Sequence, residues 1–209
     1  MFCRLSNDIL TTKDIRKVAI IILGKIKAIK KAIECECYLP ALALALTLPD
    51  ICGQIEYPEL IYTSGQRKGQ RKGREQYIKW YDSHVKPLYY ITDKDAPTNQ
   101  FDGYTCYALR CSLLHAGNFD LKSQNQKIPI DLFKLHVDKM KGQFNIHDSY
   151  HEENGKRIVD LDVYGICFLI SYAANDFYNQ NKDKATFEQF DSVVVDESWT
   201  DDTYDLLFE

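Results

Sequence analysis

Apolar residues at helical spacing are the feature that most restricts how this chain can fold. From about Thr12 to Cys35 they recur every three or four positions, and lysines occupy other faces. The apolar positions are Ile15, Val18, Ala19, Ile22, Ile26, Ile29 and Ile33. This spacing is typical of a helix that buries one face. The first segment therefore predicts an amphipathic helix packed on a core.

Four later segments are also predicted to be helical. Pro40 suits the first turn of a short second helix, and Pro49 is expected to end or kink it. The others span about residues 75–90, 101–116 and 160–180, each with apolar residues on one face. Five such helices predict a mainly α protein built as a helical bundle.

Alternating residues replace the helical spacing near residues 128–160. "PIDLFKLHVD" and "GQFNIHDSYH" alternate apolar and polar positions, and "ENGK" is a favourable turn before "RIVDLDV". We expect a small antiparallel sheet of two or three strands there, inserted into the bundle. No linker divides the chain, so residues 1–190 are expected to form a single domain, followed by a tail over residues 191–209.

Composition narrows the class of protein. The first ten residues lack the features of a signal peptide, and the apolar run "YLPALALALTLP" is about half of what a bilayer span needs. The 7 cysteines form no C-x-x-C pair, which argues against a disulfide framework or a structural zinc site. We expect a cytoplasmic protein with reduced thiols, no membrane association and no cofactor.

A short basic repeat, "GQRKGQRKGR", occupies residues 65–74. Its basic residues are Arg67, Lys68, Arg71, Lys72 and Arg74. Glycine and charge predict an exposed loop. The functional interpretation is an arm that attracts RNA phosphates without reading sequence, and the alternative is an ordinary solvated loop.

The tail combines acidic and apolar residues. Residues 191–209 contain no Lys or Arg, and their acidic residues account for more than the net charge of −4. The apolar members are Trp199, Tyr204, Leu206, Leu207 and Phe208. One hypothesis is that the tail docks on a basic cleft or a partner and competes with RNA, and the alternative is a solubilising end.

The stretch "FDGYTCYALRCSLLHAGN" places Arg110 and His115 five residues apart within an apolar helix, just before Gly117 and Asn118, where a helix is expected to stop. RNA carries its own nucleophile, the 2′-OH. A histidine can move the proton of that group, and an arginine can neutralise charge on the phosphate. The pair therefore suits RNA cleavage without a metal ion.

Arg-x4-His at the end of an apolar helix resembles the HEPN superfamily, and the upstream "LALTLPDICGQIEYP" adds to the resemblance. The resemblance implies a metal-independent endoribonuclease with Arg110 and His115 as the catalytic pair. It also implies an active site formed across a homodimer, with an RNA substrate, in a toxin–antitoxin, phage-defence or CRISPR-associated system with a possible antitoxin or defence partner. Gly117 stands where some toxin members carry a tyrosine that a partner nucleotidyltransferase modifies, so that route of neutralisation is not expected.

Structural interpretations compete with each functional one. Arg110 and His115 could instead form buried hydrogen bonds, or an ion pair with a carboxylate such as Asp50. Asp50 and Asn118 are candidate supporting residues of the site, but their default roles are a helix cap or turn and a helix stop. If Arg110 and His115 are structural, the chain is a non-catalytic RNA-binding or protein-binding module. A third possibility is an antitoxin or immunity-type partner that covers a basic protein.

Two further groups of residues have alternative interpretations. A cluster near the predicted turn resembles a metal site: His147, Asp148, His151, Glu152 and Glu153. A hairpin does not hold such a group as a helix would, so we expect no metal there. Tyr77, Trp80 and Tyr81 could stack nucleobases, but their helical spacing favours the core.

Overall fold

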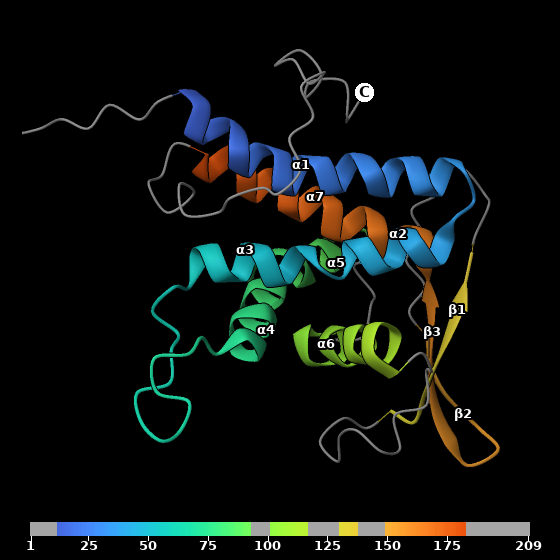
Figure 1. The fold of residues 1–209 in the computed structure, drawn as a ribbon. Helices are drawn as coiled ribbons and strands as arrows, with labels where there is room; N and C mark the ends of the chain where they lie inside the picture. The colour runs from blue at the N-terminus through green and yellow to red at the C-terminus, as the bar shows by residue number, and fades with distance from the viewer. Residues whose placement is uncertain (1–11, 93–100, 117–129, 138–148, 183–209) are drawn as a thin grey trace, which may run out of the picture.

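The computed structural model describes residues 12–92, 101–116, 130–137 and 149–182. Within these ranges the protein is mainly α-helical with a small three-stranded sheet, which confirms the predicted fold class. The helices are α1 (Thr12–Glu34), α2 (Tyr38–Ala45), α3 (Leu48–Glu56), α4 (Gly73–His84), α5 (Lys86–Thr92), α6 (Gly103–Cys111), a π-helical turn η1 (Ser112–Ala116) and α7 (Val163–Asn181). Figure 1 shows α7 alongside α1, with α4 and α6 on the other side of α2 and α3.

Two of the five predicted helices are each divided in two. The second is divided into α2 and α3, and Pro49 lies in the first turn of α3 rather than only ending its predecessor. The third is divided at Val85, and Pro87 lies in the first turn of α5. A proline lacks the N–H that an interior helical residue donates, and its ring clashes with the preceding turn. Each proline therefore begins a new helix.

The end of α1 has a strained residue. The N–H of Cys37 donates to the carbonyl of Ala32 at 2.7 Å, and the N–H of Glu36 donates to that of Ile33 at 2.9 Å. These two bonds define a Schellman motif, whose left-handed position is usually glycine. Here it is Glu36, with a φ of 58°. The turn is therefore built correctly but with an unfavourable residue.

We expect Glu36→Gly to stabilise the protein by about 1 kcal/mol, because glycine adopts a left-handed conformation without the steric cost of a side chain. Glu34→Gly is the matched control, since the same change inside the last turn of α1 should destabilise it by about 1 kcal/mol. Urea unfolding of both variants measures the difference. Equal destabilisation by the two glycines would contradict the prediction.

Aromatic residues fill the centre of the bundle. Tyr77, Trp80 and Tyr81 of α4 are completely buried, which confirms their interpretation as core residues. Trp80 meets Phe177 of α7 edge to face at 6.0 Å, and Tyr81 meets Phe101 in the same way at 6.2 Å. Such contacts fix α4 between α7 and the segment that leads into α6.

Two glycines let neighbouring helices approach α4 closely. A Cβ added to Gly53 of α3 would lie 2.5 Å from the carbonyl oxygen of Gln76. One added to Gly103 of α6 would lie 2.6 Å from that of Ile78. Backbone oxygens cannot move aside as a side chain can, so both positions require glycine. The helices that carry the candidate site residues are therefore held at backbone contact.

The sheet comprises β1 (Leu132–His136), β2 (Ser149–Glu153) and β3 (Lys156–Asp162) in the order β1-β3-β2. Asn154 and Gly155 join β2 to β3 with φ values of 53° and 68°, so "ENGK" forms the tight antiparallel hairpin that the sequence predicts. β1 pairs with β3 in parallel, however, and the expectation of a purely antiparallel sheet is wrong. β3 returns between β1 and β2, so only its partner across the short turn is antiparallel to it.

One segment, Tyr38–Glu56, is by length and composition apolar enough to cross a membrane. Half of it is buried within the protein, and it consists of two helices rather than one. Asp50 lies within the segment and pairs with two arginines. Buried core helices often have this length and composition, so the apolar character of this segment is only weak evidence for a membrane span.

Candidate functional site

Two carboxylates fix the start of α6, the helix that carries Arg110. Asp102 caps it by accepting a hydrogen bond from the N–H of Thr105 at 2.9 Å. Asp82 of α4 accepts one from the N–H of Gly103 at 2.8 Å. Burial raises the pKa of Asp82, and the bond from Gly103 acts in the opposite direction. α6 is therefore anchored to α4 at its first residue.

The other end of α6 departs from the predicted helix. Arg110 lies in its last turn, and from Ser112 to Ala116 the backbone widens into a π-helical turn that contains His115. Turns of this kind are rare and are often found at functional sites. Each residue of a π-helix rotates the chain by less than in an α-helix. In an α-helix, residues five positions apart are separated by ~140° around the helix axis. The π-helical turn makes this separation smaller for the backbones of Arg110 and His115. The side chain of His115 and all of Asn118 lie outside the described part of the chain.

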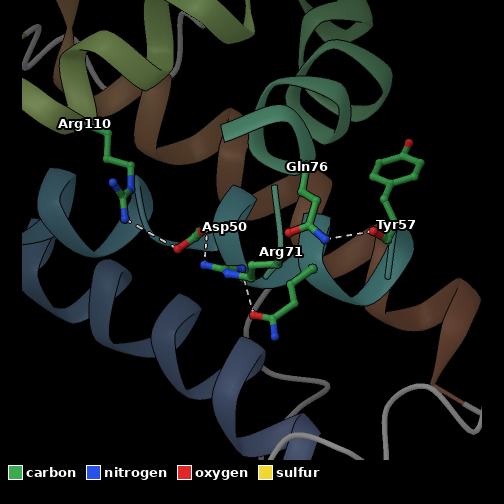
Figure 2. A network of polar contacts seen from close by, with 6 residues as sticks. Asp50, Tyr57, Arg71, Gln76 and Arg110 are labelled. Carbon is green, nitrogen blue, oxygen red and sulfur yellow. Dashed lines mark hydrogen bonds and ion pairs between the residues drawn. The ribbon is translucent and has the colours of Figure 1, made fainter. Parts of the chain in front are cut away.

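Asp50 joins two arginines that are far apart in the sequence, as Figure 2 shows. Its Oδ2 lies 3.5 Å from Nη2 of Arg110, and its Oδ1 lies 3.0 Å from Nη2 of Arg71. Arg71 also donates to Oε1 of Gln54, one turn further along α3, at 2.8 Å. The side chains of Arg110 and Asp50 are 17% and 23% exposed, so this network is shielded but reachable from solvent. The ion pair with Asp50 that the sequence offered as an alternative is confirmed.

Arg74 extends the network through aromatic rings. Its Cζ lies 5.3 Å from the ring centre of Tyr104 and 5.7 Å from that of Tyr107. The Cζ of Arg110 lies 5.7 Å from the ring of Tyr107 and 6.0 Å from that of Tyr77. Guanidinium groups at these distances are attracted to the ring faces. Rings and guanidinium groups therefore alternate from Tyr104 at the surface to Tyr77 in the core.

The Nε atoms of Arg74 and Arg110 are buried and have no hydrogen-bond partner among the described residues. A buried donor without a partner is costly, so each one requires a structural or functional explanation. We name Arg71, Arg74, Arg110 and Asp50 the arginine cluster. Asp50 pairs with Arg71 and Arg110, and Arg74 contacts aromatic rings instead, so the three guanidinium groups outnumber the one carboxylate of the cluster.

Tyr77 and Tyr107 have raised pKa values. Burial raises the pKa of Tyr77 well above its usual range, and its hydroxyl lies 3.2 Å from Sγ of Cys106. Burial and the neighbouring Cys111 also raise the pKa of Tyr107, although Arg110 lowers it. Neither phenol is therefore suited to act as a base near neutral pH. Their rings instead pack against the guanidinium groups of Arg74 and Arg110.

Residues 65–70 of the basic loop are exposed, as predicted, whereas 71–74 are partly buried and Gly73 and Arg74 already belong to α4. Backbone bonds between Tyr62 and Gln70 and between Lys72 and Leu60 close it near its base. Arg67 lies over the ring of Tyr62 at 4.3 Å and donates to its hydroxyl at 3.0 Å. Lys72 pairs with Glu75 at 3.1 Å, and Lys68 is exposed. Of the five candidate RNA-binding residues, the structure brings only Arg71 and Arg74 to Arg110.

The sequence analysis did not identify Tyr104, Tyr107 or Gln54 as residues of the candidate site. Tyr104, Tyr107 and Arg110 follow one another at intervals of three residues, which places them along one side of a helix. That spacing was a usable signal. Gln54 follows Asp50 by four residues on α3, so the two share a face as well.

The described residues near the hairpin that resemble a metal site have other contacts. Nδ1 of His151 lies 2.8 Å from Asp160, and its Nε2 lies 3.8 Å from Glu153. Among the residues that the structure describes, no group of three or more His, Cys, Asp or Glu side chains could hold a metal ion. His147 and Asp148 lie outside those residues.

The arginine cluster has the chemistry of an anion site. Planar guanidinium groups donate in pairs to phosphate oxygens, and adjacent aromatic rings suit nucleobases. Arg71 of the basic loop and Arg110 of α6 meet at Asp50 of α3, and Arg74 of α4 lies beside Tyr107, the ring that Arg110 also contacts. Comparison with protein-family models, curated proteins and solved structures finds no match to this chain.

Proposed function

We propose that the protein is a metal-independent endoribonuclease of HEPN type that acts in a bacterial toxin or phage-defence system. The observation that carries the proposal is the arginine cluster, in which Arg71 and Arg110 share Asp50, and Arg74 and Arg110 contact the same ring, that of Tyr107. Such an excess of guanidinium groups beside one carboxylate favours a polyanionic substrate.

The chemistry requires only the substrate and two side chains. His115 removes the proton of a ribose 2′-OH, and the oxygen attacks the adjacent phosphorus. The O2′–P bond forms as the P–O5′ bond breaks, and the leaving 5′-oxygen takes up the proton that His115 removed from the 2′-OH. Arg110 stabilises the charge on the phosphate oxygens during this exchange. The products are a 2′,3′-cyclic phosphate and a free 5′-hydroxyl.

Arg71 and Arg74 are assigned to the phosphates on either side of the cleaved bond. Both lie where the basic loop joins α4, so they extend the positive charge away from Arg110. Contacts of this kind supply affinity without reading sequence, and salt weakens them. A homodimer with its two-fold axis beside η1 would present Arg110 and His115 twice in one groove.

Cleavage of a mixed RNA pool in EDTA tests the proposal. Wild type is expected to cut, and His115→Ala is expected to lose at least about a hundredfold in rate, as removal of a general acid or base does. His151→Ala is the matched control, because that histidine is on the sheet and pairs with Asp160. Thermal unfolding verifies that both variants are folded. Strict dependence on Mg²⁺, or products with a 5′-phosphate, would exclude this mechanism.

One observation favours a second function. The ion pair between Arg110 and Asp50 is what a purely structural arginine would form, so the same bundle can serve as a non-catalytic RNA-binding or protein-binding module. In that case wild type does not cut RNA, and both His115→Ala and Arg110→Ala mainly lower the melting temperature. Cleavage by wild type distinguishes the two functions.

A further inference from the structure

We propose that Tyr104 is a nucleobase-stacking position, which holds an unpaired base of the RNA beside the phosphate bound by Arg74 and Arg110. The inference rests on the proposed function in taking RNA as the ligand, and it adds how the site selects the form of that RNA. It assigns a recognition role to a residue outside the Arg110–His115 pair.

The exposure of Tyr104 is the first argument. Its side chain is 47% exposed although it is in the first turn of a well-anchored helix, whereas Tyr77 at the other end of the alternating series is completely buried. An aromatic ring that remains half in water contributes little to a core. Core packing therefore does not account for tyrosine at this position.

The partner of Tyr104 is the second argument. The guanidinium of Arg74 lies 5.3 Å from the centre of its ring and 5.7 Å from that of Tyr107, so Arg74 links the exposed ring to the ring beside Arg110. A base that stacks on Tyr104 thus lies at the outer end of a series that continues through Arg74 and Tyr107 to Arg110. Proteins that bind single strands combine aromatic stacking with backbone charge in this way.

The form of RNA follows from the geometry of stacking. A base in a duplex already stacks on its neighbours, so it reaches an outside ring only after unstacking. An unpaired base can stack on Tyr104 directly, and each of the four bases has an aromatic face that allows this. The site should therefore prefer single strands and tolerate many sequences.

Binding of a labelled 2′-O-methyl RNA, measured by fluorescence anisotropy, tests this role without cleavage because the strand has no free 2′-OH. The probes are a mixed-sequence single strand, its duplex and the same strand with abasic residues. Tyr104→Ala should bind the single strand about tenfold more weakly, and Tyr104→Phe should bind it like wild type, since stacking needs the ring alone. On the duplex and the abasic strand, Tyr104→Ala should differ from wild type by less than about twofold, because neither offers a free base.

Tyr164→Ala is the matched control, since that tyrosine is 43% exposed but lies on α7. The inference is overturned if Tyr104→Ala binds like Tyr164→Ala, if its loss persists on the abasic strand, or if wild type does not bind the single strand. The two proposals can fail separately. Tyr104-dependent binding with no RNA cleavage in EDTA rejects the ribonuclease, whereas cleavage with no role for Tyr104 rejects the stacking position.

Discussion

Arg110→Ala should lower the rate of RNA cleavage by about a thousandfold, the loss typical when a preorganised cation or donor is removed from a phosphate-transfer site. The guanidinium of Arg110 is preorganised by Tyr107, Tyr77 and Asp50, so little motion is needed when charge develops on the phosphate. Arg110→Lys keeps the charge but loses the planar donors, and it should retain no more than about a tenth of the activity.

The fold should survive this change. Removing one partner of a shielded ion pair is costly when it leaves a charge without compensation. Asp50 would still pair with Arg71 at 3.0 Å, so no lone carboxylate remains. Loss of activity with a nearly unchanged melting temperature would thus separate catalysis from structure.

Arg157→Ala provides the matched control. Arg157 also pairs with a single aspartate, Asp131, at 3.0 Å, but it lies on β3 and is 52% exposed. Initial rates on a mixed RNA pool in EDTA, with unfolding curves for each variant, are the measurement. Equal rates for Arg110→Ala and Arg157→Ala would remove Arg110 from the mechanism.

The positions of the helices could be predicted from the spacing of apolar residues. Only some of the breaks within those helices could be predicted. The divisions near Pro49 and Pro87 were readable in principle, because proline marks a first turn. The π-helical turn after Cys111 has no comparable signal in the sequence. The parallel pairing of β1 depends on where a distant strand returns, which alternation within a strand does not encode.

One contact of the candidate site was predicted from the sequence. Arg110 and its partner Asp50 were both identified from the sequence, and their ion pair is present. The repeat could not show which basic residue joins them, because Arg67 and Arg71 occupy equivalent places in "GQRKGQRKGR". In the structure Arg67 lies on Tyr62, whereas Arg71 pairs with Asp50 beside an isolated β-bridge to Ile61. Identical local sequence thus has different tertiary partners.

Gly53→Ala is expected to have the largest effect on stability, a loss of about 3 kcal/mol, at the upper end of the usual cost of overpacking. The new Cβ would lie 2.5 Å from the carbonyl oxygen of Gln76 and 2.8 Å from its carbon. Both are backbone atoms, so α3 and α4 must separate. The higher helix propensity of alanine offsets about 1 kcal/mol at most and does not reverse the sign.

Gly73→Ala is the matched control within the same pair of helices. Its Cβ would meet only the guanidinium of Arg71, at 3.5 Å, an ordinary contact at the first residue of α4. The melting temperature should fall by roughly 6 to 12 °C for Gly53→Ala and stay nearly constant for Gly73→Ala. Displacement of α3 also moves Asp50 away from Arg110, so Gly53→Ala should cleave RNA more slowly even below its melting temperature. Equal stability of the two variants would mean that α3 and α4 are not held at backbone contact, and the positioning of Asp50 would then need another cause.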